Sequence, residues 1–313
     1  MAVMVTSPVS VIVCSHNSIR GILDRTLAAL KAQTLPLAET ELLIVDNGSD
    51  VPLADVLDLS WHPRARIVVE PKLGHMIARL RGLEEAAGRL IVFVDDDNIL
   101  DPDYLETAVA IARTAPQIGA FGGSIIAEFE TPPEPWSKPF LTALALREVT
   151  RDSWSNSYQW DTVPFGAGMC LTKAVADAFK AAMQRDESRL AFGRVGELSF
   201  GGGDDIEMAF TACDMGLGCG VFAKLRLTHV IPRRRLERTY LTRIVEGGAY
   251  TGTVLSRKRG LLKARPLDNL RRRLAILLAT LKGDASTRDH LSAKLRGRLR
   301  ALRQTAADAI HEA

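Results

Sequence analysis

The sequence contains few cysteines and no long apolar run. Four of its 313 residues are cysteine, and none of them is spaced like a pair of zinc ligands. This argues against a disulfide-stabilised fold and a structural zinc site, and it favours a reducing compartment. No apolar stretch approaches the roughly 20 residues that a spanning helix needs, and the first residues lack the basic start of a signal peptide. We therefore expect a cytoplasmic protein.

Charge is distributed unevenly along the chain. Hydrophobic residues make up 47% of the sequence and charged residues 25%, which excludes a disordered or low-complexity protein. From Lys224 to the end, 22 Lys and Arg stand against 7 Asp and Glu, whereas residues 1–223 carry 18 basic and 30 acidic residues. The basic tail indicates an anionic partner, or else its arginines pair with the acidic body or are solvated.

Short apolar runs alternate with helical periodicity in the first part of the chain. The apolar runs are continuous, which suits a parallel sheet covered on both faces, and the alternation predicts an α/β domain. We expect strands at 9–14, 42–45, 67–70 and 90–94, and helices at 17–33 and 74–87.

The pattern changes after residue 129. Residues 130–165 are rich in Pro and Trp and have few regular periods, which is typical of binding loops. From residue 236 onward only helical periods occur, including two amphipathic stretches. We expect a strand near 163–171, a helix at 172–183, a helix that follows a glycine-rich loop at 201–205, a strand at 220–228, and amphipathic helices at 266–282 and 287–311.

Three aspartates, Asp95, Asp96 and Asp97, directly follow the apolar strand at 90–94. In open α/β sheets, ligands bind at the edge where strands end. Adjacent carboxylates repel one another and need a cation or protons. Hard oxygen ligands suit Mg²⁺ or Mn²⁺, which can bridge to phosphate oxygens. A helix N-cap needs only one aspartate, so we favour a metal site.

Other polar residues are expected at the same edge of the sheet. Asp46 ends the second strand and opens an Asp-Asn-Gly turn, where a carboxylate is ordinarily a turn residue. Its position beside the three aspartates favours a hydrogen bond to a nucleobase or ribose instead. Ser15, His16 and Asn17 follow the first strand and would line the same crevice.

An acidic cluster follows the glycine-rich loop. One carboxylate is enough to cap the next helix, yet Asp204, Asp205 and Glu207 crowd together there. Their mutual repulsion should raise at least one pKa, as a general base requires. His229 ends a later apolar strand, and a lone histidine in that place is more often a core or surface residue than a ligand.

Six segments follow one another along the chain: VIVCSHN, LLIVDNGSD, ARLRGLEEAAGRLIVFVDDDN, GAGMCL, GGGDDIEM and HVIPRRRL. In this order they resemble the family 2 glycosyltransferases of the GT-A fold, over residues 9–245. The resemblance implies an α/β fold in which a nucleotide-binding sheet is flanked by helices, followed by a helical basic C-terminal extension. It implies a catalytic domain at 1–235, with a nucleotide-binding half at 1–129 and an acceptor-binding half at 130–235, and an extension at 236–313.

The resemblance also implies a reaction and a set of residues. The enzyme would be inverting and would move one sugar from a nucleotide-diphosphate sugar, with UDP expected, to a saccharide or lipid-linked acceptor in glycan synthesis. The residues implied for the nucleotide sugar are Ser15, His16, Asn17, Asp46, Arg79, Asp95 and Asp96. The residues implied for Mn²⁺ or Mg²⁺ are Asp97, Asp95 and His229.

Catalysis and acceptor binding are implied further along the chain. Asp205 matches the family's catalytic base, and Asp204 stands where Glu is usual, so both are candidates. The chain departs from the family where Leu80 follows Arg79 in place of Asn, and at His16 in place of Tyr. Residues implied near the transferred sugar and acceptor are Gly166, Ala167 and Gly168. The loop tryptophans either stack on the acceptor or pin the loop to the core: Trp136, Trp154 and Trp160.

Two other functions and three roles of the tail stay open. A metal-dependent nucleotidyltransferase would also use aspartates, and a non-catalytic sugar-nucleotide-binding protein would not need Asp205.

The leucines and arginines of 266–311 fit docking on the catalytic domain, pairing in a homodimer, or attachment to an anionic membrane at its inner face. We favour the membrane, because it uses both residue types. No base-reading motif accompanies the charge, so we expect no nucleic-acid partner.

Overall fold

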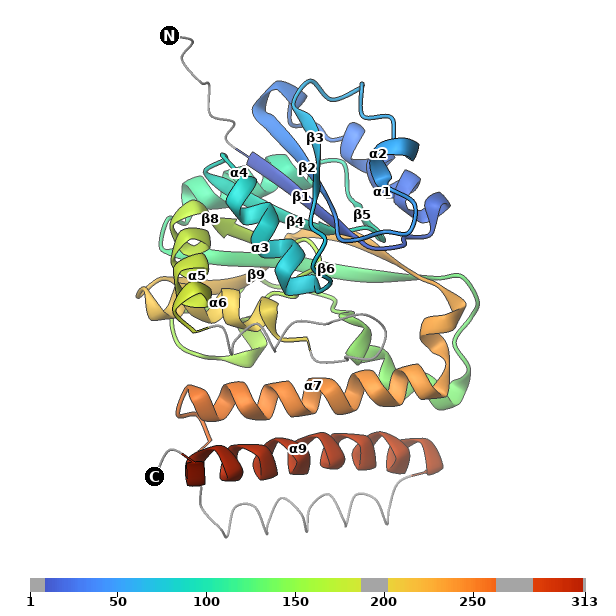
Figure 1. Ribbon diagram of the computed structural model, residues 1–313, viewed down its shortest axis with the longest axis vertical. Coiled ribbons are helices and arrows are strands. Elements are labelled where there is room, and N and C mark those ends of the chain that lie inside the picture. Colours follow the sequence, from blue (N-terminus) through green and yellow to red (C-terminus); the bar gives the residue numbers. More distant parts are fainter. Residues whose placement is uncertain (1–8, 187–201, 263–283, 312–313) are drawn as a thin grey trace. The chain divides into compact units, whose positions relative to one another are not determined.

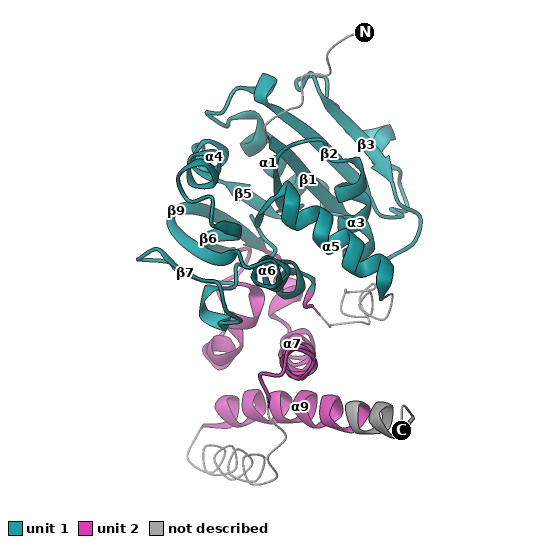
Figure 2. Ribbon diagram, turned by 90° about the vertical axis from the view of Figure 1, so that its left-hand side faces the viewer, with its two compact units in different colours: residues 1–128, 146–196, 204–230 teal, residues 129–145, 197–203, 231–313 magenta. Residues whose placement is uncertain are grey.

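The computed structural model describes residues 9–186, 202–262 and 284–311. Figure 1 shows the elements along the chain, and Figure 2 divides them into two compact units. Unit 1 comprises residues 1–128, 146–196 and 204–230, and unit 2 comprises residues 129–145, 197–203 and 231–313. Among the described residues, no helix is long and apolar enough to cross a membrane.

The first half of unit 1 is a parallel sheet with helical crossovers, as the alternating pattern predicts. Its strands lie in the order β3-β2-β1-β4, and all the pairs between them are parallel. The elements are β1 (Val9–Ser15), α1 (Arg20–Lys31), η1 (Leu37–Glu39), β2 (Thr40–Asp46), α2 (Leu53–Val56), β3 (Ala65–Val69), α3 (His75–Glu85) and β4 (Leu90–Asp95).

Antiparallel strands extend the sheet beyond β4 in the order β8-β6-β9-β5, and β7 also pairs with β9. The strand expected near 163–171 is shorter than predicted, because the chain turns through Gly168 at φ +72° before β8 begins. The elements are β5 (Asn98–Leu100), α4 (Tyr104–Thr114), β6 (Ile118–Phe129), β7 (Ser153–Ser155), η3 (Trp160–Thr162), β8 (Cys170–Thr172), α5 (Lys173–Arg185), α6 (Asp204–Asp214) and β9 (Gly218–Ile231).

Both faces of the central strands are buried, which explains why their sequences are continuously apolar. Val11 and Val13 of β1 pack into a core with Leu23 and Leu27 of α1. On the opposite face, Ile12 lies against α3, where a Cβ added at Gly82 would clash with the Ile12 side chain. This close approach places the first turns of α3 next to the carboxyl ends of β1 and β4. Figure 2 shows α3 and α5 side by side over this face.

Unit 2 is built around two helices that run parallel, α7 (Arg238–Lys258) and α9 (Ala285–His311). They approach closely because α9 presents small residues to α7: Ala293 and Ala301 are fully buried, and a Cβ at Gly297 would clash with the Glu246 carbonyl. The leucine stripe of the amphipathic helix expected at 287–311 is half-buried in the structure: Leu291, Leu295, Leu299 and Leu302. The expected helix at 266–282 lies outside the described residues.

The proline-rich segment also belongs to unit 2. It forms η2 (Pro135–Leu144), and η6 (Arg233–Leu236) leads into α7. The Phe140 ring packs edge-on against His290, and the Arg238 guanidinium lies 4.6 Å above the Trp136 ring. These contacts group residues 129–145 with the C-terminal helices, whereas the sequence division placed them in the catalytic domain.

Candidate active site

Three parallel strands of unit 1 end at one edge of the sheet and bring predicted site residues together. Ser15 lies opposite Asp46 in the β1–β2 register, and Cys14 lies opposite Asp95 in the β1–β4 register. The Ser15 hydroxyl donates a hydrogen bond of 2.8 Å to a carboxylate oxygen of Asp96. The predicted clustering of these residues at one edge is therefore present in the structure.

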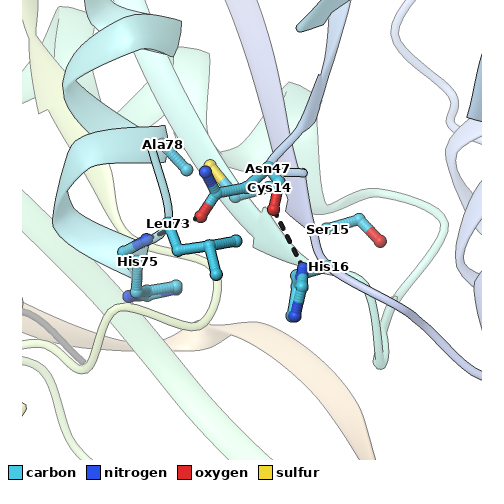
Figure 3. Close-up of a pocket in the computed structure, with 8 residues that line it drawn as sticks. Cys14, Ser15, His16, Asn47, Leu73, His75 and Ala78 are labelled. Atoms are coloured by element: carbon cyan, nitrogen blue, oxygen red, sulfur yellow. Dashed lines mark hydrogen bonds between the residues drawn. The ribbon is translucent and has the colours of Figure 1, made fainter. Parts of the chain in front are cut away.

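A cavity of about 190 Å³ opens beside this edge (Figure 3). The Asn47 side chain shapes one wall, because its amide donates to the Glu70 and Lys72 carbonyls while its oxygen accepts the Gly74 N–H. His16 Nδ1 lies 2.9 Å from the Asn47 carbonyl oxygen. The lining residues are Cys14, Ser15, His16, Asn47, Leu73, Gly74, His75 and Ala78.

Asp46 and Asn17 take part in the turns around the cavity. Both oxygens of Asp46 accept backbone N–H groups, from Ser49 at 3.0 Å and Leu53 at 2.8 Å, and the side chain is 3% exposed. Asn17 has a φ of +50° and exchanges two hydrogen bonds with Asp50. These contacts establish a turn role for both residues, and their predicted contact with a nucleotide stays a prediction.

A buried arginine connects α3 to the ends of β4 and α6. Arg79 is 2% exposed, and its guanidinium donates to Asp204 at 2.7 Å and to Asp95 at 3.1 Å. A Cβ at Gly166 would overlap the same guanidinium, so a larger residue there would have to displace Arg79 from its carboxylate partners. Arg79 was expected to bind the nucleotide sugar; in the structure it holds two carboxylates that are distant in sequence.

His75 at the start of α3 completes this ion-pair network. Its Nδ1 lies 3.1 Å from Asp204 and its Nε2 lies 3.7 Å from Asp95. Burial and the Arg79 charge lower the pKa of His75, but the two carboxylates outweigh them and raise it above the usual value. Burial raises the pKa of Asp95, but His75 and Arg79 hold it well below the usual range, so Asp95 is ionised. Sequence reasoning missed His75, because its partners lie 20 and 129 residues away.

Asp205 lies at the start of α6, next to the Gly166 turn. Its Oδ2 accepts the Gly166 N–H at 3.2 Å, and its Oδ1 accepts the N–H of Ile206 at 2.8 Å. Burial, and then the charge of Asp204, raise the pKa of Asp205 above the usual value, against the opposing effect of Arg79. A carboxylate with a raised pKa suits general-base catalysis, whereas Asp204 is paired with Arg79.

Two of the three predicted metal ligands lie together. His229 Nε2 is 3.5 Å from Asp97 Oδ2, and each residue is 6% exposed. The β5–β9 pairing causes this approach, because Asn98 is opposite His229 in the register. The third candidate, Asp95, turns toward Arg79, and the described part of the chain contains no group of three His, Cys, Asp or Glu residues in position to hold a metal ion. A carboxylate and an imidazole still fit a Mn²⁺ or Mg²⁺ ion that completes its coordination with phosphate and water oxygens.

Of the residues predicted to bind the acceptor, one contacts Asp205 and the tryptophans pack against other residues. Gly166 contacts it directly, Ala167 is buried, and Gly168 accepts a 2.6 Å hydrogen bond from the Tyr104 hydroxyl. The tryptophans have separate packing partners: Trp160 packs edge-on against Phe210, Trp154 covers Gly218 and Gly220, and Trp136 packs within unit 2. Their role in acceptor binding stays a prediction.

The same N-terminal region matches a known family of enzymes. The model of glycosyl transferase family 2 matches residues 10–174, more than half of the chain. The chain belongs to this family. It is 33% identical over 105 residues to validoxylamine A glucosyltransferase of Streptomyces hygroscopicus, covering 32% of this chain and 24% of that protein. It is 29% identical over 170 residues to an N-acetylglucosaminyltransferase of Sinorhizobium fredii, covering 52% and 38% of the two chains. The chain thus spans less than half the length of these relatives.

Two solved structures share the fold of this family 2 member. TarS 1–349 of S. aureus superposes with a TM-score of 0.50 at 15% identity, covering 95% of this chain and 91% of that one. GalNAc-T7 with UDP, GalNAc and Mn²⁺ superposes with a TM-score of 0.53 at 14% identity, covering 86% and 54%. These likenesses confirm the predicted GT-A fold with its α/β sheet.

Proposed function

We propose that this family 2 member is an inverting glycosyltransferase that moves one sugar from a nucleotide-diphosphate sugar to an acceptor hydroxyl. The observation that carries the proposal is the position of Asp205, which lies beside the Gly166 turn and has a raised pKa. A carboxylate in this environment can take the proton from a hydroxyl as that hydroxyl attacks the anomeric carbon. Attack from the face opposite the leaving diphosphate inverts the configuration.

The cavity at the ends of β1 and β2 is the proposed site for the nucleotide of the donor. It offers the polar groups of Ser15, His16 and His75 together with the apolar side chain of Leu73. This combination suits a nucleoside, which has a flat base and a hydroxyl-rich ribose. UDP is the expected nucleotide, and the structurally similar GalNAc-T7 was crystallised with UDP. Asp96 accepts a hydrogen bond from Ser15, which lines this cavity, and Asp96 is proposed to contact the ribose.

Asp97 and His229 are the proposed protein ligands of a divalent metal. When bound, Mn²⁺ or Mg²⁺ supplies positive charge that stabilises the leaving diphosphate. Asn98 orients Asp97, because its amide donates a 3.0 Å hydrogen bond to the Asp97 carboxylate. The structure supports two protein ligands rather than three, since Asp95 is engaged by Arg79 and His75.

Arg79 and Asp204 are proposed to act indirectly. Arg79 holds Asp204, the first residue of α6, and thereby holds the adjacent Asp205 against Gly166. We therefore propose Asp205 as the base and Asp204 as a positioning residue.

The basic tail is proposed to attach weakly to an anionic membrane, so that a lipid-linked or surface glycan would serve as acceptor. Part of its charge has partners within unit 2: Arg296 pairs with Glu246 at 2.9 Å, and Arg300 lies 5.3 Å from the Tyr250 ring centroid. The side chains of Arg288, Arg298 and Arg303 are exposed and would supply the attraction.

A ligand screen followed by a product assay tests the proposed function. Thermal unfolding is measured with UDP-, GDP- and dTDP-sugars, each with and without Mn²⁺, because a ligand that binds only the folded state raises the Tm. We expect one nucleotide to stabilise the protein in a Mn²⁺-dependent manner. The sugar nucleotide that binds is then incubated with candidate acceptors, and the released product is identified. A nucleoside diphosphate supports glycosyl transfer, whereas release of inorganic diphosphate indicates a nucleotidyltransferase.

A further inference from the structure

Arg147 contacts the segment that precedes Gly166, the residue bonded to the proposed base, and it has no part in the site described above. Its guanidinium stacks 4.5 Å above the Phe165 ring, and Nη1 donates a 2.7 Å hydrogen bond to the Val163 carbonyl oxygen. The residue after Phe165 is Gly166, whose N–H donates to Asp205. The Arg147 backbone is anchored by two hydrogen bonds with Ile125. The side chain is therefore held in a defined position on the wall that also holds Asp205.

The charge of Arg147 is only weakly compensated. Within the described part of the chain, no carboxylate forms an ion pair with it, whereas Arg79 has two. Burial lowers the pKa of Arg147, and the more distant charges of Asp161 and Asp205 offset this only in part. A guanidinium carries five N–H donors, and the protein accepts one of them here.

A half-buried guanidinium with spare donors matches a planar or tetrahedral oxyanion. Its fork binds carboxylate or phosphate through two parallel hydrogen bonds, and partial burial strengthens them. The donor cavity is lined by other residues, from β1, the turn after β2 and the start of α3. Arg147 instead adjoins the segment 163–166, in which the Gly166 N–H donates to Asp205.

We propose that Arg147 binds a carboxylate or phosphate group of the acceptor, beside the hydroxyl that Asp205 deprotonates. The acceptor is then an acidic saccharide or a phosphate-bearing glycan. This inference rests on the proposed function, because it assumes that an acceptor binds next to Asp205.

Binding of small anionic probes tests the inference. The full chain is saturated with UDP and Mn²⁺ and titrated by NMR with methyl β-D-glucuronide, with inorganic phosphate, and with neutral methyl β-D-glucoside. The same titrations are run on Arg147→Gln, on Arg147→Lys, and on Arg151→Gln, a control that removes an exposed arginine from the same segment. Circular dichroism and thermal unfolding verify that each variant is folded.

We expect Arg147→Gln to bind both anions about 10- to 100-fold more weakly, as for loss of charge-assisted hydrogen bonds. Arg147→Lys should fall between this variant and the wild type, because it keeps the charge without the fork. Arg151→Gln should match the wild type, and the neutral glucoside should bind all four proteins equally.

Two results would overturn the inference. One is that neither anion binds the wild type, or that both bind Arg147→Gln as tightly as the wild type. The other is that Arg147→Gln loses its affinity for UDP, which would assign Arg147 to the donor diphosphate. Failure of the proposed function is a separate outcome, because it is seen as absence of Mn²⁺-dependent UDP binding to the wild type, and the anion titrations can be repeated without nucleotide.

Discussion

Replacing the buried Arg79 by methionine should destabilise unit 1 at neutral pH. The variant keeps most of the side-chain volume but leaves Asp204 and Asp95 without their guanidinium partner. Removing one partner of a buried ion pair costs about 3–5 kcal/mol, because a charge then stays buried without compensation. Most of this loss should come from Asp204, which is 4% exposed, since water can reach the half-exposed Asp95.

The cost should depend on pH in a defined direction. The pKa of Asp95 is held below its usual value, so its interaction with Arg79 stabilises the fold above about pH 4 and is lost as the pH falls. The difference between wild type and Arg79→Met should therefore be larger at pH 7 than at pH 3. Urea unfolding at both pH values, followed by circular dichroism, gives the two free energies.

A control and a double mutant make the experiment specific to the network. Arg81→Met removes a half-exposed arginine from the same helix and should cost less than about 1 kcal/mol. Adding Asp204→Asn to Arg79→Met should recover part of the stability, because the buried carboxylate that has lost its guanidinium partner is then replaced by a neutral amide. A loss below about 1 kcal/mol in Arg79→Met, or an equal loss at pH 7 and pH 3, would refute the assignment of Arg79 as a buried counter-ion.

Three further predictions concern catalysis, the metal and the tail. Asp205→Asn should lower kcat by about 10²–10⁴-fold with nearly unchanged donor binding, and Asp204→Asn should lower it less. Because the charge of Asp204 raises the pKa of Asp205, Asp204→Asn should also move the acidic limb of the kcat/KM profile to lower pH. If Asp204→Asn lowers kcat more than Asp205→Asn does, Asp204 is the base instead. Asp97→Ala should abolish the Mn²⁺-dependent rise in Tm with UDP, and activity that survives EDTA would contradict a metal site. The full chain should pellet with anionic but not neutral liposomes at low salt, and joint replacement of Arg288, Arg298 and Arg303 by Gln should reduce this; equal pelleting would leave the tail as a packing element.

The sequence by itself determined the strands and helices of the nucleotide-binding half. The strand ending at Asp95 and the helix carrying Arg79 were predictable, because local periodicity reports which faces are buried. The position of the aspartates at a sheet edge also followed, since parallel strands release their carboxyl ends on one side. The order of motifs was enough to predict the family.

Only the tertiary structure decided how these groups are paired. Arg79 and Asp204 are 125 residues apart, and no local pattern shows that they form an ion pair. The proposed roles of Asp205 as base and Asp204 as positioning residue depend on which carboxylate contacts Arg79 and which contacts Gly166. In α9, the leucine stripe was the obvious apolar face, yet the small side chains around Gly297 pack on α7. Two backbones that approach closely require glycine at the contact. Hydrophobic periodicity shows where apolar side chains recur, so it does not reveal such a contact.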